Sequence, residues 1–147
     1  MSLRDLWGFK DVKELEKNIK DMPDTIFKEQ ISLLGDKTEF VLYGSPVPIR
    51  VNNVEIDYSM ATLFNIVVPK LDNYKKTIMI MYSNPEKEYP VAISVGRSFE
   101  EDCEFFQPDY LCHNKEEFEN SIKEILSSEE ILHIIGVLYA KASMLGA

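Results

Sequence analysis

The chain has 147 residues, of which 45% are hydrophobic and 28% charged, and its net charge is −9. This composition is typical of a soluble globular protein and excludes a disordered one, so we expect a single domain over residues 1–147. The acidic balance argues against a nucleic-acid-binding protein, because phosphate backbones are bound by clustered lysine and arginine.

The first third of the sequence predicts two helices. Asp11 and Glu14 have the spacing of a capping box, at the start of a helix that continues to Asp21. A second helix is expected to start at Pro23 and to end at Gly35, because glycine tolerates a left-handed cap. Three large apolar side chains precede both helices and are expected to fold back onto the same core: Leu6, Trp7 and Phe9.

Between residues 38 and 96 the apolar period changes to two, which predicts an antiparallel meander of about five strands. The first strand is expected to begin at residues 40–43 and to be interrupted or bulged at 44–48. Asn52 and Asn53 then have the preferences of a tight hairpin turn, with a second arm at residues 54–56. Further strands are expected at residues 61–68, 77–82 and 89–95. Residues 77–82 are nearly continuous in apolar side chains, so we place them near the middle of the sheet, buried on both faces.

Residues 100–130 contain 11 acidic and two basic residues, so this stretch has a net charge of −9 and the rest of the chain is balanced. Capping patterns predict that this acidic third is helical. The cap pairs are Ser98 with Glu101, Asn114 with Glu117, and Ser127 with Glu130. The predicted fold class is therefore α+β: two N-terminal helices, the antiparallel meander, and a short helix plus two C-terminal helices packed on the sheet.

Cys103, Cys112 and His113 have the side chains that could form a nucleophile–base pair or hold a zinc ion. The spacing argues against both, because the adjacent Cys112 and His113 tend to point apart, and acidic neighbours raise the pKa of a thiol. We therefore expect no catalytic residue, no metal and no cofactor.

The two cysteines suit a reducing compartment, and charged residues follow the first methionine at once, so we expect a cytoplasmic protein. The longest apolar stretch is too short to cross a bilayer, so no membrane partner is expected.

His133 lies in an otherwise apolar helix and shares a stripe with Gly136, Ala140 and Ser143. Small residues along one helical line allow a neighbouring element to approach closely. Two interpretations remain open. The stripe could be a tight helix crossing with a hydrogen-bonded core histidine, or it could line a pocket or a subunit contact in a homo-oligomer.

Two classes of function are compatible with the sequence. The leading hypothesis is a non-enzymatic, inhibitor-like or immunity-like protein whose acidic third binds a basic protein, although the acidic run could also be only a solvated surface. The predicted binding residues are Glu100, Glu101, Asp102, Glu104, Phe105, Phe106 and Tyr110. The alternative is a small-ligand module, or a small enzyme, with a pocket between the sheet and the C-terminal helices. Its candidate lining residues are Tyr58, His113 and His133.

Overall fold

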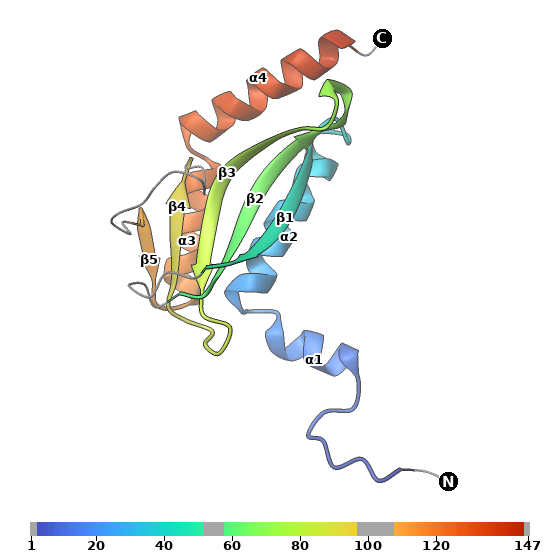
Figure 1. Cartoon of the computed structure of the whole chain (residues 1–147), viewed down its shortest axis with the longest axis vertical. Coiled ribbons are helices and arrows are strands. Elements are labelled where there is room, and N and C mark those ends of the chain that lie inside the picture. The colour runs from blue at the N-terminus through green and yellow to red at the C-terminus, as the bar shows by residue number, and fades with distance from the viewer. Residues whose placement is uncertain (1–2, 52–57, 97–107, 146–147) are drawn as a thin grey trace.

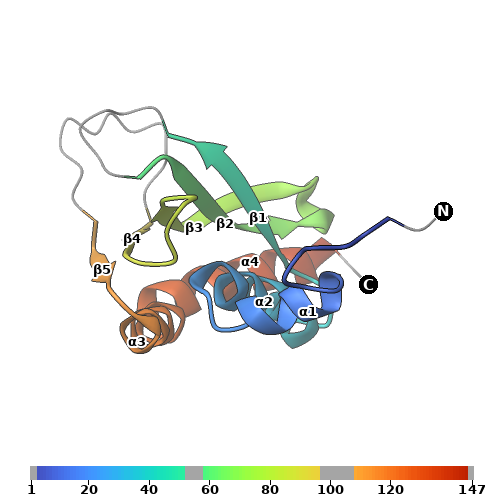
Figure 2. The same cartoon turned by 90° about the horizontal axis from the view of Figure 1, so that it is seen from below.

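The computed structural model describes residues 3–51, 58–96 and 108–145. An antiparallel sheet carries the helices on one face, which confirms the predicted α+β class (Figures 1 and 2). The helices of the described part are α1 (Val12–Ile19), α2 (Pro23–Lys37), α3 (Lys115–Leu126) and α4 (Glu129–Leu145), with a 3-10 turn, η1 (Pro69–Leu71). The strands are β1 (Tyr43–Arg50), β2 (Met60–Val68), β3 (Tyr74–Ser83), β4 (Val91–Val95) and β5 (Tyr110–Cys112).

The sheet is a simple meander in the order β1-β2-β3-β4-β5, with β3 at its centre. Met79 and Met81 of β3 belong to the core that the helices cover, whereas Ile80 and Tyr82 pack on the opposite face. All four side chains are buried. The prediction that this strand lies in the middle of the sheet, buried on both faces, is therefore confirmed.

A bulge in β3 changes which side chains reach the helices. The register with β2 shifts so that Phe64 pairs with Met79 but Asn65 pairs with Thr77, which leaves Ile78 as the extra residue. Ile78 and Met79 therefore both enter the helix-covered core, although they are consecutive. The hydroxyl of Thr77 donates a hydrogen bond to Asn65 Oδ1 beside the bulge, so the polar side chains at the shift are paired.

The first strand differs from its prediction. Residues 44–48 do not interrupt it, because β1 runs without a break from Tyr43 to Arg50 and pairs with β2 along that length. Pro46 and Pro48 are tolerated because β1 is an edge strand, where a missing amide donor on the outer side breaks no ladder hydrogen bond. The same two prolines make this edge unsuitable for the addition of a further strand. The predicted hairpin at Asn52 and Asn53 and its second arm lie outside the described residues.

The fifth strand is not the one that the sequence predicts. β5 comes from residues 110–112 of the acidic third and pairs with β4 at the edge opposite β1. The acidic third is thus not wholly helical: the predicted short helix after Ser98 falls outside the described residues, whereas the two longer helices are α3 and α4. The predicted cap of α3 is confirmed, since Asn114 Oδ1 accepts from the N–H of Glu117 at 2.9 Å.

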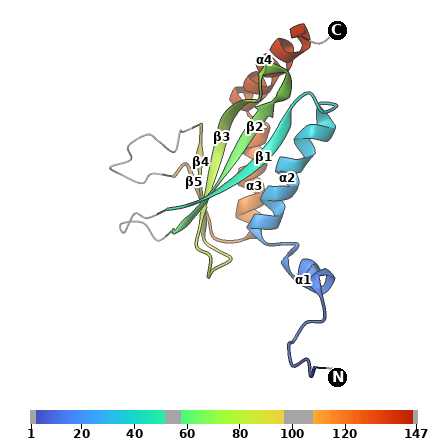
Figure 3. The ribbon, with the colours of Figure 1, turned by 45° about the vertical axis from the view of Figure 1, so that its right-hand side comes forward.

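The helix α2 lies against β1 at very short range (Figure 3). A Cβ atom at Gly44 would stand 2.1 Å from the carbonyl oxygen of Ile31, so only glycine permits this approach. Gly35 does not end α2, as the sequence predicts; the helix continues to Lys37, and Glu39 and Phe40 take the positive φ angles of the turn. Gly35 instead leaves room for the ring of Phe40 beside the helix.

The segment before α2 does not fold back onto the core. Residues 3–19, which we call the N-terminal arm, extend away from the sheet (Figure 1), and α1 buries no side chain. Leu6 and Trp7 are exposed and Phe9 is half-buried, with Trp7 contacting Phe9 at 6.0 Å between ring centroids. The expectation that these three residues join the core is wrong, because the two aromatic rings contact each other instead.

The last helix also differs from two expectations, which concern its cap and the position of His133. Ser128 caps α4 through its hydroxyl and the N–H of Ile131 (3.3 Å), whereas Ser127 belongs to the end of α3 and bonds the carbonyl of Lys123. His133 is exposed, which excludes the core-histidine interpretation. α4 faces the body instead with Ile131, Leu138 and Ala142.

We predict that Gly44→Ala lowers the free energy of unfolding by about 3 kcal/mol, because the added methyl group meets helix backbone that cannot move away without separating α2 from the sheet. Urea unfolding measures the change. Gly8→Ala is the matched control, since a Cβ at Gly8 meets nothing within 4 Å. If Gly44→Ala were as stable as the control, α2 would not approach β1 this closely.

Candidate functional site

The candidate site is one lateral edge of the molecule, where β5 leads directly into α3. Cys112 is the last residue of β5 and Lys115 the first of α3, so two residues separate the strand from the helix. Cys112 is buried and His113 is exposed, which confirms that these neighbours point apart. We call the group Asp109, Tyr110, His113, Glu116, Glu117 and Glu124 the β5–α3 edge.

Hydrogen bonds hold three carboxylates of the β5–α3 edge in place. Asp109 accepts from the N–H of Val95 at 2.7 Å and thereby joins the start of β5 to the end of β4. Glu117 accepts from the backbone N–H of His113 at 3.1 Å, and its Oε1 lies 3.1 Å from His113 Nδ1. Both contacts with His113 lower the pKa of Glu117, the backbone bond first. Burial raises the pKa of Tyr110, and so does the neighbouring Glu124, through its negative charge and through the hydrogen bond that it accepts from the Tyr110 hydroxyl.

The charge of this region is strongly unbalanced. Residues 108–130 contain seven acidic and two basic residues, a net charge of −5, and all seven carboxylate residues are exposed or half-exposed. One of the two bases, Lys115, is already engaged by Asp21 at 2.9 Å and by Glu119 at 3.6 Å. The hydrogen bond between Lys115 and Asp21 lowers the pKa of Asp21 and raises that of Lys115. The pair also ties the chain just before α2 to the start of α3.

The predicted binding residues fall into two groups. Tyr110 lies on the β5–α3 edge, half-buried beside the exposed Leu111. The others lie outside the described residues: Glu100, Glu101, Asp102, Glu104, Phe105 and Phe106. Asp109, Glu116, Glu117 and Glu124 complete the edge and were not predicted as binding residues, although the charge count of residues 100–130 includes them.

The three candidate pocket residues do not come together. Tyr58 packs with the small core on the face of the sheet turned away from the helices. His113 lies between β5 and α3, and His133 lies on the exposed side of α4. Neither of the two grooves described next is lined by any of them.

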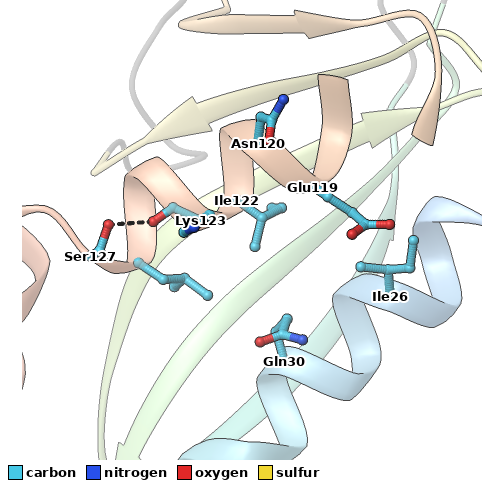
Figure 4. Close-up of a pocket in the computed structure, with 8 residues that line it drawn as sticks. Ile26, Gln30, Glu119, Asn120, Ile122, Lys123 and Ser127 are labelled. Carbon is cyan, nitrogen blue, oxygen red and sulfur yellow. Dashed lines mark hydrogen bonds between the residues drawn. The ribbon is translucent and has the colours of Figure 1, made fainter. Parts of the chain in front are cut away.

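A groove of about 510 Å³ separates α2 from α3 (Figure 4). Its apolar lining comes from Ile26, Ile122 and Leu126, and Glu119 points across it from α3 toward α2. The remaining lining residues are Gln30, Asn120, Lys123 and Ser127. Sequence reasoning missed this groove, because its walls come from helices about 90 residues apart. A second groove of similar volume lies where β1 ends and β2 begins, between Pro48 and Pro85.

The one described thiol is placed for packing rather than for reaction. Cys112 lies in the helix-covered core, where burial raises its pKa, and its Sγ lies 3.5 Å from Ser121 Oγ. Cys103 lies outside the described residues. Within residues 3–51, 58–96 and 108–145, no group of three or more His, Cys, Asp or Glu side chains is arranged to hold a metal ion.

Comparison of the chain with protein-family models, curated proteins and solved structures finds no match. Among the helices in the described part of the chain, none has both the length and the apolar character needed to cross a membrane.

Tyr89 lies near Cys112 of β5 and Glu119 of α3. Its hydroxyl group is buried and has no hydrogen-bond partner among the described residues. Burial, followed by the nearby charges of Glu88 and other acidic groups, raises the pKa of Tyr89 to about 12. A raised pKa means that folding favours the neutral phenol. The stability that folding gains by keeping the Tyr89 phenol neutral is therefore fully present below pH 10, the ordinary tyrosine pKa. This stability is lost as the pH rises toward about 12.

We predict that Tyr89→Phe removes this part of the alkaline loss of stability, and that at pH 7 the variant is more stable by about 1 kcal/mol, because an unpaired buried hydroxyl is eliminated. Thermal unfolding between pH 7 and pH 12 measures both effects. Tyr74→Phe, at an exposed tyrosine, is the control and should keep the wild-type profile because Tyr89 is still present. A destabilised Tyr89→Phe variant would mean that the hydroxyl has a partner.

Proposed function

We propose that the protein is a non-enzymatic protein-binding module and that its β5–α3 edge binds a basic protein. The observation that carries the proposal is the concentration of five exposed or half-exposed carboxylate residues, against two lysines, in the stretch that runs from Asp109, just before β5, to the end of α3. A basic partner is the class of macromolecule that such a surface attracts.

The geometry of the edge supports binding as well as attraction. Asp109 and Glu117 are held by backbone N–H groups, so part of the charge is fixed before a partner arrives. Preformed polar groups reduce the entropy lost on association. Tyr110 and Leu111 place an aromatic and an exposed aliphatic side chain beside these carboxylates. The edge thus combines apolar contact area with charged surroundings, which is the usual composition of a protein interface.

The proposal places the partner on side chains rather than on the sheet backbone. β5 has three residues, and β1 presents Pro46 and Pro48 along the opposite edge. Neither edge offers the long row of backbone donors that strand addition needs. Binding to nucleic acid is disfavoured by the same charge that favours a basic protein. We further propose that the protein acts in the cytoplasm, where its cysteines remain thiols.

A small polar ligand in the α2–α3 groove is the second candidate. The groove has a volume within the usual range of ligand sites, and polar groups from Gln30, Glu119 and Lys123 surround its apolar lining. Its charge is balanced between Glu119 and Lys123, so it would suit a ligand with both donor and acceptor groups. A small molecule retained by the purified protein, and lost on Gln30→Trp at a half-buried position of the groove wall, would favour this candidate over the first.

The proposal predicts that the double variant Glu116→Gln/Glu124→Gln captures less of the partner from an extract of the native cells than the wild-type protein does. Glutamine keeps the size of each side chain and can still accept the Tyr110 hydrogen bond, so folding should be unchanged. Glu16→Gln/Glu29→Gln is the control, because it removes the same charge at exposed positions of α1 and α2, away from the edge (Figure 1). Quantitative mass spectrometry of the three captures at low salt measures the difference.

A protein bound by the wild type and the control, but depleted at least about threefold in the edge variant, should be basic. Equal capture by both double variants, or a depleted protein that is acidic, would contradict the proposal. The amide variant at Glu100, Glu101, Asp102 and Glu104 extends the test to the predicted residues, and slower association is expected there as well.

A further inference from the structure

The helix α4 has the composition of a buried helix but is exposed on its outer side. Between Ile131 and Leu145 the only charged residue is Lys141. Helices that are apolar all round are normally covered all round. Leu132 is 55% exposed and Met144 84%, and Val137 and Tyr139 are also exposed. Figure 1 shows α4 at one end of the molecule, with one side turned away from the sheet and from α2 and α3.

The outer side of α4 is arranged as a groove between two ridges. His133, Gly136, Ala140 and Ser143 form its central line, and all four are exposed. A Cβ atom at Gly136 would meet nothing within 4 Å, so this line is open for close approach. At about 100° per residue, Leu132 and Tyr139 flank the line on one side and Val137 and Met144 on the other. Small residues between bulky ones give the surface that a second helix fits.

We propose that α4 packs antiparallel against α4 of a second copy of this chain, with the two helices crossing near Gly136. This surface is distinct from the β5–α3 edge and does not depend on the function proposed for it. A second copy is the fitting occupant because the surface is self-complementary: each helix offers both the small-residue line and the ridges that flank it. A two-fold axis through such a surface closes the assembly at a dimer.

The charges on α4 favour the antiparallel orientation. Glu130 and Lys141 lie on the same flank of the helix, about 20° apart in projection. Glu130 is six residues before Gly136 and Lys141 is five residues after it, so the antiparallel crossing brings Glu130 of each copy near Lys141 of the other. A parallel pair would instead bring the two Glu129 side chains together on the outer face, and like charges repel.

The size of the contact predicts a reversible dimer. A helix of 17 residues is about 25 Å long. One such helix offers less than the roughly 800 Å² per partner that stable complexes bury. We therefore expect dissociation within the micromolar range of concentrations, where sedimentation equilibrium can follow it.

The test compares two substitutions at one position of the full chain. Gly136→Ala should keep the dimer, because a methyl group fits a close helix crossing. Gly136→Glu should raise the dissociation constant at least about tenfold, because a long charged side chain separates the helices. Both variants should keep the wild-type circular dichroism, since a Cβ at Gly136 meets nothing within 4 Å and both alanine and glutamate form helix better than glycine. Sedimentation equilibrium of the wild type and the variants gives the dissociation constants.

The orientation is tested by exchanging the charges. Glu130→Lys and Lys141→Glu should each weaken the dimer, and the double exchange should restore it toward the wild-type dissociation constant. A wild-type protein that is monomeric up to millimolar concentration would overturn the proposal, as would a dimer unaffected by Gly136→Glu. Additive weakening in the double exchange would overturn the antiparallel crossing. A monomer that binds phosphatidylcholine–phosphatidylserine vesicles through α4 would overturn the dimer itself, because the occupant of the outer side of α4 would then be lipid.

Discussion

The contact between the backbone of α2 and β1 at Gly44 is the constraint on which the arrangement of the helices depends. Because no side chain stands between Gly44 and Ile31, α2 lies deep against the edge of the sheet. Thr38 fixes the turn that follows, since its hydroxyl oxygen accepts from the N–H of Leu42 at 3.1 Å and lies 2.9 Å from the carbonyl oxygens of Leu34 and Leu42. With α2 placed over β1, α3 covers the other half of the same face through Phe118 and Ile122.

The β5–α3 edge and the outer side of α4 are both exposed because only part of the chain is needed to form the helix layer on the sheet. α2 and α3 supply most of the helical core, so α4 attaches by only a few buried side chains and α1 by none. The short β5 ends the sheet and is followed by α3 after two residues, which brings Asp109, just before the strand, and the carboxylates of the helix to one edge. Charge at one edge and apolar surface at one end thus allow two different interactions on a single fold.

The sequence predicts those parts of the fold that depend on local pattern. The apolar run of β3 identifies the central strand, and the cap at Asn114 identifies the start of α3. Features set by distant contacts could not be predicted: β5 is too short for an alternating pattern, and the bulge at Ile78 depends on the register with β2. The stripe through His133 was recognised as a close-approach surface, but whether it faced the body depended on Ile131 and Leu138 packing there instead. The α2–α3 groove exists only once both helices lie on the sheet.

The central claim is that the acidic edge selects a basic protein, and the salt dependence of the association rate tests it most directly. Exposed charges are screened within about 10 Å at 0.1 M ionic strength, so steering by this edge should weaken steadily as salt is added. The rate constant for the captured partner, measured by stopped flow from about 0.02 to 0.5 M salt, should fall at least about tenfold for the wild-type protein. A rate that stays constant over that range would contradict the account, because the carboxylates of the β5–α3 edge would then play no part in recognition.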